Sequence, residues 1–521
     1  MSSKLTPIER SNHQKTFWVF FFLSMISVLF SSGRIGNADA HSQLMAAYVF
    51  VSTGQFGSVV PPGGFEDNVG ESGSGSKPLP KSFFWEAPNG LYYQTHDIGN
   101  VAMMLPIAAV WNWAFFRPGA LEEDEIPRPI KALTSIYFSL LSGLAATALF
   151  ACLSLSLPFR ESFYYSVLFL FTSFFLTYTR MPWDVAGAGA FAIVAFYFLL
   201  RARNENRLST CSTVLMAAST GIATNFRCSF GPFLVLIIFV ALLPYRSCFS
   251  IRHVSIFCIT IAIIVTPSFI YNYVRTGNPL HPATVIPRYP TKPELSWAAF
   301  DHLWRMYFSL NKGLFVYSPV ILFAFTAKQK ADIRLMIAVV VGLIGYSFGL
   351  ASTKSWSGGA SWGPRYLVPL LPILFYLAAV QIDQHGRVWK RLATVFFITG
   401  FFVNLPTFVS NYQLAINEFP AANNDLINLP YPQFAAWRGF FSGLAGNEIP
   451  IRDEIKIMLE SGQSKASTTF PDLLIVHIAN EIGFLGGFVV SAVLLLGLTF
   501  GLLKVTSNFT PKTIYSSGAQ A

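Results

Sequence analysis

Long apolar runs are the feature that most restricts the fold of this chain. Only 12% of its 521 residues are charged, about half of the ~25% that is typical of soluble domains. That fraction cannot cover the surface of a soluble body of this size, so we predict an all-α polytopic membrane protein and exclude a simple soluble enzyme. Thirteen segments approach the ~20 apolar residues that a helix needs to cross a bilayer. They lie near residues 16–33, 98–116, 132–157, 162–179, 184–200, 211–226, 229–244, 253–271, 313–327, 332–351, 365–382, 390–409 and 478–503.

Basic residues set the expected orientation of these segments. If all thirteen crossed, the basic clusters at 201–207, 328–334 and 387–391 would lie outside the cell, against the positive-inside rule. If 98–116 dips into the membrane without crossing, all three clusters become cytoplasmic. We therefore predict about twelve spans (11–13), an uncleaved first span with a cytoplasmic N-terminus, and a multi-pass protein of the inner (plasma) membrane. The net charge of +10 is scattered between apolar runs, which fits a lipid bilayer and no nucleic acid.

This orientation places every large loop on the outer face. We expect a transmembrane module over 1–409 whose first outer loop, 34–97, begins with an interfacial helix at 35–52. A second outer loop follows at 410–477, and 478–521 forms the last span and a cytoplasmic tail. Recognition or chemistry is therefore expected on the outer rim.

Three outer stretches resemble the GT-C superfamily of membrane glycosyltransferases, in particular the bacterial relatives of dolichyl-phosphate-mannose–protein mannosyltransferases. The first is Gly36-Asn37-Ala38-Asp39, which leads into a helix ending at Ser52-Thr53-Gly54. The second runs from Asn89 to Asp97, NGLYYQTHD, and the third runs from Trp356 to Tyr366, WSGGASWGPRY. Arg180-Met181-Pro182-Trp183-Asp184 is similar to a short family loop that ends in Pro-x-Asp.

The resemblance implies a GT-C-like fold and a specific activity. Members transfer a sugar from a polyprenyl-phosphate-linked donor to an acceptor on the outer (periplasmic) face. For this chain it implies an inverting hexosyl- or pentosyltransferase of the cell envelope whose acceptor is a glycan, a lipid or a protein. Such a reaction needs a carboxylate to accept the proton of the attacking hydroxyl and cations to stabilise the departing phosphate.

Asp39 is the candidate catalytic base. It is the first carboxylate after the first span, and partial desolvation at the membrane surface is expected to raise its pKa into a useful range. The structural alternative is that Asn37 or Asp39 caps the following helix.

The segment from 354 to 365 supplies the candidate donor ligands. Arg365 follows a Gly-Pro turn at the mouth of a span, where a guanidinium binds phosphate with two donors; the alternative is an arginine that snorkels to the interface. Lys354 is a second candidate phosphate ligand. Trp356 and Trp362 are candidates for stacking on sugar, although tryptophans are also common interfacial anchors.

A second group of candidates lies at the end of the first outer loop. Asp97, His96 and Glu86, together with Asp39, are suited to hold an acceptor or a divalent cation (Mg²⁺ or Mn²⁺), or are solvated surface groups. No spacing of a metal site occurs, so neither a metal ligand set nor a certain cofactor is predicted. Arg275 is a further candidate for phosphate binding, although the Thr-Gly-Asn-Pro turn that follows it explains its sequence equally well.

Two other functions remain open from the sequence. A transporter or flippase for a lipid-linked or small solute usually carries matched, broken segments and ionisable groups near mid-membrane. This chain shows no internal repeat, and its charges gather in asymmetric outer loops, which favours the enzyme. An O-antigen ligase or polymerase, or a non-catalytic subunit of an envelope complex, has a similar composition.

Overall fold

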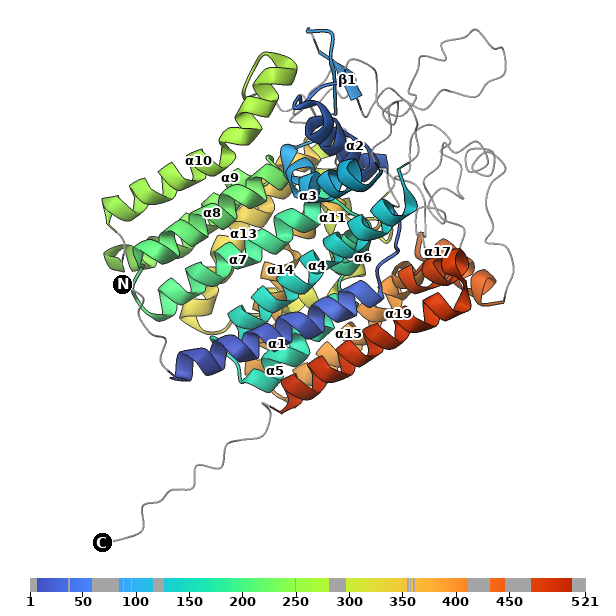
Figure 1. The fold of residues 1–521 in the computed structure, drawn as a ribbon. Coiled ribbons are helices and arrows are strands. Elements are labelled where there is room, and N and C mark those ends of the chain that lie inside the picture. Colours follow the sequence, from blue (N-terminus) through green and yellow to red (C-terminus); the bar gives the residue numbers. More distant parts are fainter. Residues whose placement is uncertain are drawn as a thin grey trace.

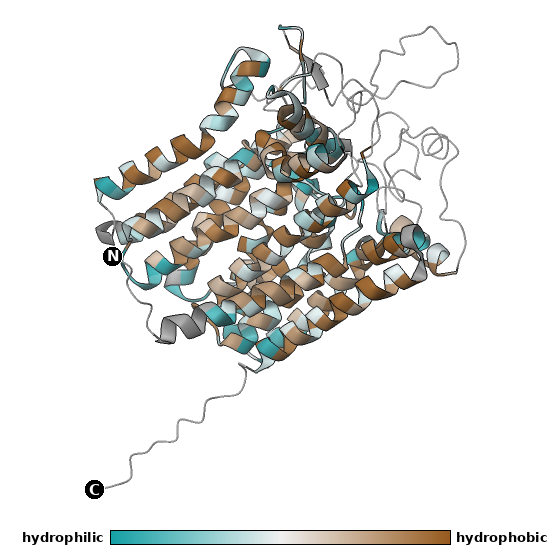
Figure 2. Cartoon of the chain, viewed as in Figure 1, coloured by the Kyte–Doolittle hydropathy of each residue, from teal (hydrophilic) through white to brown (hydrophobic). Residues whose placement is uncertain are grey.

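The chain forms a bundle of long helices with a smaller cap at one end (Figure 1). The computed structural model describes residues 7–35, 38–58, 84–87, 89–94, 96–115, 126–248, 250–280, 297–353, 356, 358, 361–410, 432–445 and 470–507. All statements below concern these residues. Apolar residues dominate along the bundle, and hydrophilic residues gather toward its two ends (Figure 2).

The twelve segments that we expected to span all contribute helices to the bundle. Ten of them form α1 (Pro7–Leu29), α4 (Arg128–Leu153), α7 (Asp184–Asn204), α8 (Thr210–Phe226), α9 (Gly231–Leu242), α10 (Ile251–Thr276), α13 (Lys330–Ala351), α14 (Leu371–Gln384) with the preceding 3₁₀ turn η4 (Arg365–Leu370), α15 (Arg387–Val409) and α19 (Leu474–Thr506). The other two are broken helices, α5 (Phe159–Thr172) with α6 (Phe175–Arg180), and α12 (Leu314–Tyr317) with η3 (Pro319–Phe325).

Seven of the described helices are long and apolar enough to cross a membrane. Three shorter apolar helices accompany them. The predicted all-α, multi-pass membrane fold is therefore confirmed, while the number of crossings stays a prediction. The start of α1 and the end of α19 lie at the same end of the bundle (Figure 1), as an even number of passes requires.

Small residues let the bundle helices approach closely. Gly143 on α4 lies directly against Ser24 on α1, and Gly187 on α7 lies against the ring of Phe226 at the end of α8. A methyl group at either glycine would overlap its neighbour. Such close contacts are the usual way in which helices associate in lipid, because apolar side chains gain little there from leaving the solvent.

The end of the bundle opposite the start of α1 carries the cap. It contains α2 (Ala38–Thr53), α3 (Ile98–Phe115) and a hairpin of β1 (Phe84–Glu86) and β2 (Tyr92–Gln94), in which Trp85 pairs with Tyr93. The predicted helix at 35–52 thus forms as α2. Tyr48 stacks on Trp111 at 4.0 Å between ring centroids, and Asn100 donates to Gln43 over 2.8 Å. These contacts join α3 to α2 in the cap, and the membrane-dipping role of 98–116 stays a prediction.

Two further helices occur within the later loops. They are α11 (Trp297–Phe308) and α17 (Pro432–Leu444). The sequence indicated aromatic and polar loops there without assigning helices. The side-chain amide of Gln433 on α17 donates to the carbonyl of Leu310, just after α11, over 2.6 Å. The two loops are therefore tied together.

A buried ion pair fastens the last helix to the rest of the bundle. Arg180, at the end of α6, contacts Asp472 at 2.8 Å, and both side chains are almost fully buried. The same guanidinium donates to the carbonyls of Phe30 and Ser410, at the ends of α1 and α15. Asp472 also accepts from His477 over 2.8 Å. One arginine thus joins four segments that are distant in sequence.

Candidate active site

Three segments of the chain meet at the carboxylate of Asp39. This residue lies in the first turn of α2. Its Oδ2 accepts a hydrogen bond from Nη2 of Arg365, the first residue of η4, over 2.9 Å. Its Oδ1 lies 3.3 Å from Nε2 of His96, between β2 and α3. The three side chains are all largely shielded from solvent, so their charges interact strongly.

A second carboxylate extends this cluster. Asp184, the first residue of α7, lies 3.8 Å from Nη2 of Arg365 and 3.0 Å from Nη1 of Arg227. The guanidinium of Arg365 also lies 3.9 Å from the ring centroid of Trp183. The result is a row of alternating charges in the order His96, Asp39, Arg365, Asp184 and Arg227, whose five members come from five different parts of the fold.

Several buried donors of this row are unsatisfied. Within the described part of the chain, Nε of Arg365 and Nε of Arg227 have no hydrogen-bond partner, and neither has the indole Nε1 of the adjacent Trp183. Leaving such a group unpaired costs about 1–3 kcal/mol. A ligand that offers acceptor oxygens would recover that cost, so the site is suited to an anion.

The surroundings keep Asp39 ionised. Burial alone would raise its pKa, but the charges of His96 and Arg365, and the hydrogen bonds from both, outweigh burial and hold the pKa of Asp39 well below its ordinary value. The expectation that desolvation raises this pKa is therefore wrong for the unliganded protein. Burial likewise lowers the pKa of His96, but the neighbouring carboxylates of Asp39 and Asp184 raise it above its ordinary value. The proton of this pair belongs to the imidazole.

A buried lysine approaches the same cluster from another loop. Lys312, between α11 and α12, is 4% exposed. Its Nζ donates to the carbonyl of Ser361 over 2.5 Å and to the hydroxyl of Ser361 over 3.1 Å. Burial, reinforced by the positive charge of Arg365, lowers the pKa of Lys312 to about 7. Lys312 therefore gains or loses its charge near neutral pH.

The structure brings three of the predicted site residues together, namely Asp39, His96 and Arg365. Asp97 and Arg275 lie behind them. Oδ2 of Asp97 accepts from the backbone amide of Cys228 over 3.0 Å, and Arg275 bonds to backbone carbonyls of the segment that carries His96.

The remaining predicted residues lie apart from this cluster or outside the described part of the chain. Trp356 is 2% exposed and stacks on His302 at 4.8 Å. Trp362 is fully buried and donates its indole N–H to Asn404 over 3.0 Å. Neither ring is open to a sugar in this structure. Lys354 lies outside the described residues, and only the backbone of Glu86, in β1, is described.

Sequence reasoning missed Asp184, Arg227 and Lys312 as members of the site. Asp184 had a signal, because it ends the Arg-Met-Pro-Trp-Asp loop. Arg227 and Lys312 are single basic residues beside apolar segments, and such residues usually snorkel to the interface. Only the tertiary structure shows that Arg227 pairs with Asp184 and that Lys312 is buried against Ser361. Together with Arg365 and protonated His96 they supply the positive charge described at the site.

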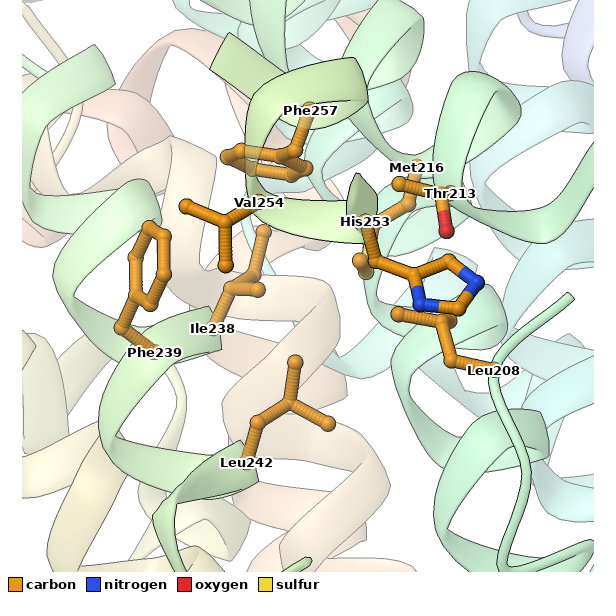
Figure 3. A pocket seen from close by; sticks show the side chains of 9 residues that line it. All are labelled: Leu208, Thr213, Met216, Ile238, Phe239, Leu242, His253, Val254 and Phe257. Atoms are coloured by element: carbon orange, nitrogen blue, oxygen red, sulfur yellow. The ribbon is translucent and has the colours of Figure 1, made fainter. Parts of the chain in front are cut away.

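A small pocket occurs at the opposite end of the bundle. It lies between the start of α8, the end of α9 and the start of α10 (Figure 3). Its lining is almost entirely apolar: Leu208, Thr213, Met216, Ile238, Phe239, Leu242, His253, Val254 and Phe257. Because the pocket contains none of the clustered charges, it does not belong to the candidate site.

The described fold is similar to that of a solved membrane protein. ArnT from Cupriavidus metallidurans bound to undecaprenyl phosphate superposes with a TM-score of 0.50 at 13% sequence identity, over 96% of this chain and 77% of that one. The protein has a GT-C fold. The GT-C resemblance predicted from the sequence is thereby confirmed at the level of the fold.

Other comparisons add little to this GT-C assignment. The apo structure of the same ArnT gives a TM-score of 0.47 at 15% identity, over 94% of this chain and 74% of that one. No protein-family model matches the chain, and no curated protein sequence matches it.

Proposed function

We propose that this protein is an integral membrane glycosyltransferase. It transfers a sugar, with inversion, from a polyprenyl-phosphate-linked donor to a hydroxyl-bearing acceptor on the outer (periplasmic) face of the inner membrane. Asp39 is the base, and Arg365 binds the donor phosphate.

The observation that carries this proposal is the direct contact between Asp39 and Arg365. The two side chains lie 2.9 Å apart and provide the two opposite charges that glycosyl transfer from a phosphate requires. The Nε–H groups of Arg365 and Arg227, which have no partner among the described residues, give a phosphate further donors. A guanidinium binds phosphate through two parallel hydrogen bonds, which a single ammonium cannot do.

The fold supports the class of donor. The ArnT that superposes on this chain was crystallised with undecaprenyl phosphate. A polyprenyl phosphate combines a long apolar tail with an anionic head, and this chain pairs an apolar bundle with a cationic site at the capped end. The outer location rests on the basic clusters predicted to be cytoplasmic.

The proposed reaction proceeds by a single displacement. The acceptor hydroxyl attacks the anomeric carbon on the face opposite the phosphate, and its proton passes to Asp39. The bond between the anomeric carbon and the phosphate oxygen breaks, and its electron pair leaves with the polyprenyl phosphate. Arg365, with Lys312 in its charged form, stabilises the growing negative charge on that phosphate.

Donor binding also prepares the base in this scheme. In the unliganded protein, Arg365 lowers the pKa of Asp39 and so weakens it as a base. A donor phosphate that takes over the hydrogen bonds of Arg365 removes part of that effect. The pKa of Asp39 then rises only when a donor is bound, so without a donor Asp39 stays unprotonated.

The test is transfer by purified protein in membrane vesicles with a radiolabelled undecaprenyl-phosphate sugar and an envelope extract as the source of acceptors. The proposal requires labelled product from native protein and loss of product from Asp39→Asn. An equal yield from both proteins would remove Asp39 from the role of base. Repeating the assay with EDTA tests the divalent cation that the sequence left open.

A further inference from the structure

Arg275 forms hydrogen bonds with the backbone of the segment that carries His96. Nη1 of Arg275, in the last turn of α10, donates to the carbonyl of Gln94 over 3.0 Å and to the carbonyl of His96 over 2.8 Å. The first carbonyl belongs to the last residue of β2 and the second to His96 itself, between β2 and α3, so the placement of these two residues decides where the imidazole lies. The side chain of Gln94 adds bonds to the backbone N–H and C=O of His96, over 2.5 and 2.8 Å.

Arg275 is itself fixed in place. Its side chain is 1% exposed, and Nη2 donates to Oδ1 of Asn272 over 2.6 Å. The guanidinium lies 4.4 Å from the ring centroid of Tyr271, and the hydroxyl of Tyr271 reaches the carbonyl of Gln94 at 3.5 Å. Tyr271, Asn272 and Arg275, near the end of α10, therefore act together: Tyr271 and Arg275 contact the backbone of the segment that carries His96, and Asn272 holds the guanidinium in place.

This support explains a buried charge on a helix that is otherwise largely exposed. Along the apolar window of α10 only 22% of the residues are buried inside the protein, yet Arg275 is enclosed. Burying a guanidinium is costly unless its donors are satisfied. Its Nη1 and Nη2 donate to Oδ1 of Asn272 on its own helix and to the carbonyls of Gln94 and His96, so the guanidinium is directed toward the segment that carries His96.

We infer that Arg275 is a positioning residue that holds the imidazole of His96 within hydrogen-bonding distance of Asp39. The inference rests on the proposed function for its catalytic meaning, because Asp39 is the proposed base. The ionisable groups that face His96 are Asp39 from α2, Asp184 from α7 and Arg365 from η4. Without Arg275, the backbone around His96 shifts and the distance between His96 and Asp39 increases. The pKa of each of these two groups then depends less on the charge of the other.

The direct test is the titration of His96 followed by NMR in detergent-solubilised protein with ring-labelled histidine. The His96 signal is assigned from its disappearance in His96→Gln. Arg275→Met is expected to lower the pKa of His96 by about one unit, because the imidazole loses its carboxylate partner while staying buried. Arg275→Lys, which keeps a charge and one donor, is expected to lie between Arg275→Met and native protein.

Two further variants keep the test decisive. Tyr271→Phe removes only the weaker bond to Gln94 and serves if Arg275→Met fails to fold; it is expected to shift the pKa in the same direction by less. Arg252→Met, at the exposed opposite end of α10, is the matched control and is expected to leave the titration unchanged. A native titration curve in Arg275→Met and Arg275→Lys, or an equal shift in Arg252→Met, would overturn the inference.

Sugar transfer is measured on the same samples to separate the two proposals. A lowered His96 pKa in Arg275→Met, with no transfer by any variant or by native protein, supports the positioning role and contradicts the proposed function. Transfer by native protein with an unaltered His96 titration in the variants contradicts the positioning role alone. Where both proposals hold, the pH profile of transfer moves together with the His96 titration.

Discussion

Nη2 of Arg365 lies 2.9 Å from Oδ2 of Asp39, although 326 residues separate the two in sequence. The contact joins the start of the first cap helix to the start of a buried span at the end of the bundle. It is reinforced on one side by His96 and on the other by Asp184. The guanidinium of Arg365 lies between two carboxylates, and its Nε has no partner in the described part of the chain, so it is suited to exchange one protein partner for an anionic ligand.

Arg365→Met is predicted to weaken the binding of undecaprenyl phosphate by about 10- to 100-fold, which corresponds to the loss of charge-assisted hydrogen bonds. Arg365→Lys is expected to recover only part of the affinity, since it keeps the charge but not the two-donor fork. Equilibrium binding of labelled undecaprenyl phosphate measures both. Arg305→Met serves as the control, because Arg305 is more than one third exposed and pairs with Asp301 at 2.8 Å. Equal losses in the Arg365 and Arg305 variants would contradict the assignment.

The stabilising contribution of His96 is predicted to depend on pH. Its pKa in the folded protein lies above the ordinary value of 6.5, so the protonated form stabilises the fold fully below about pH 6.5 and loses that effect as the pH rises through the folded-state pKa. The difference in thermal unfolding midpoint between native protein and His96→Gln should therefore shrink from about pH 6 to about pH 9. A constant difference over that range would show that His96 carries no proton-linked stability.

Lys312 is predicted to contribute the opposite slope. In the folded protein it loses its proton near pH 7, whereas the unfolded chain keeps it to its ordinary value of 10.5. The unfolded state therefore binds more protons in this range, and stability rises with pH between these values. Subtracting the midpoint of Lys312→Met from that of native protein isolates this slope. A difference that stays flat or falls between these pH values would show that Lys312 keeps its proton in the folded protein, and would contradict the prediction.

Asp472→Asn is predicted to destabilise the protein by about 3–5 kcal/mol, because it leaves the buried guanidinium of Arg180 without its carboxylate. Both side chains of that pair are almost fully buried. Glu205→Gln breaks a pair of similar length with Arg201, but both of its side chains are about half exposed, so about 0–1 kcal/mol is expected. Chemical unfolding in detergent micelles compares the two. Similar effects would mean that the Arg180 contacts do not secure the last helix.

The sequence predicted the fold better than it predicted the details of the cap. Long apolar runs have few alternatives to helices in a bilayer, so the segments around α4, α7 and α19 were readily found. Helices α11 and α17 were missed because amphipathic segments of 12 and 13 residues do not differ in composition from polar loops that contain aromatics.

The site was predicted in part for a similar reason. Asp39 and Arg365 each stand next to the end of a span, which marks them in the sequence. Nothing in the sequence shows that they touch, and their contact reverses the expected direction of the Asp39 pKa. Arg275 was predicted as a candidate phosphate ligand; its described partners are the carbonyls of Gln94 and His96 and the side chain of Asn272, and no residue pattern identifies backbone partners of this kind.

The most direct test of the proposed function is the transfer of radiolabelled sugar from undecaprenyl phosphate by purified native protein and by Asp39→Asn in the same vesicles. Removing a general base typically lowers the rate about 10²- to 10⁴-fold, and we predict a loss in that range, measured at a temperature at which Asp39→Asn is still folded, because the substitution also removes the buried contacts of Asp39 with Arg365 and His96. Labelled product formed at the native rate by a folded Asp39→Asn protein would contradict the assignment of Asp39 as the base.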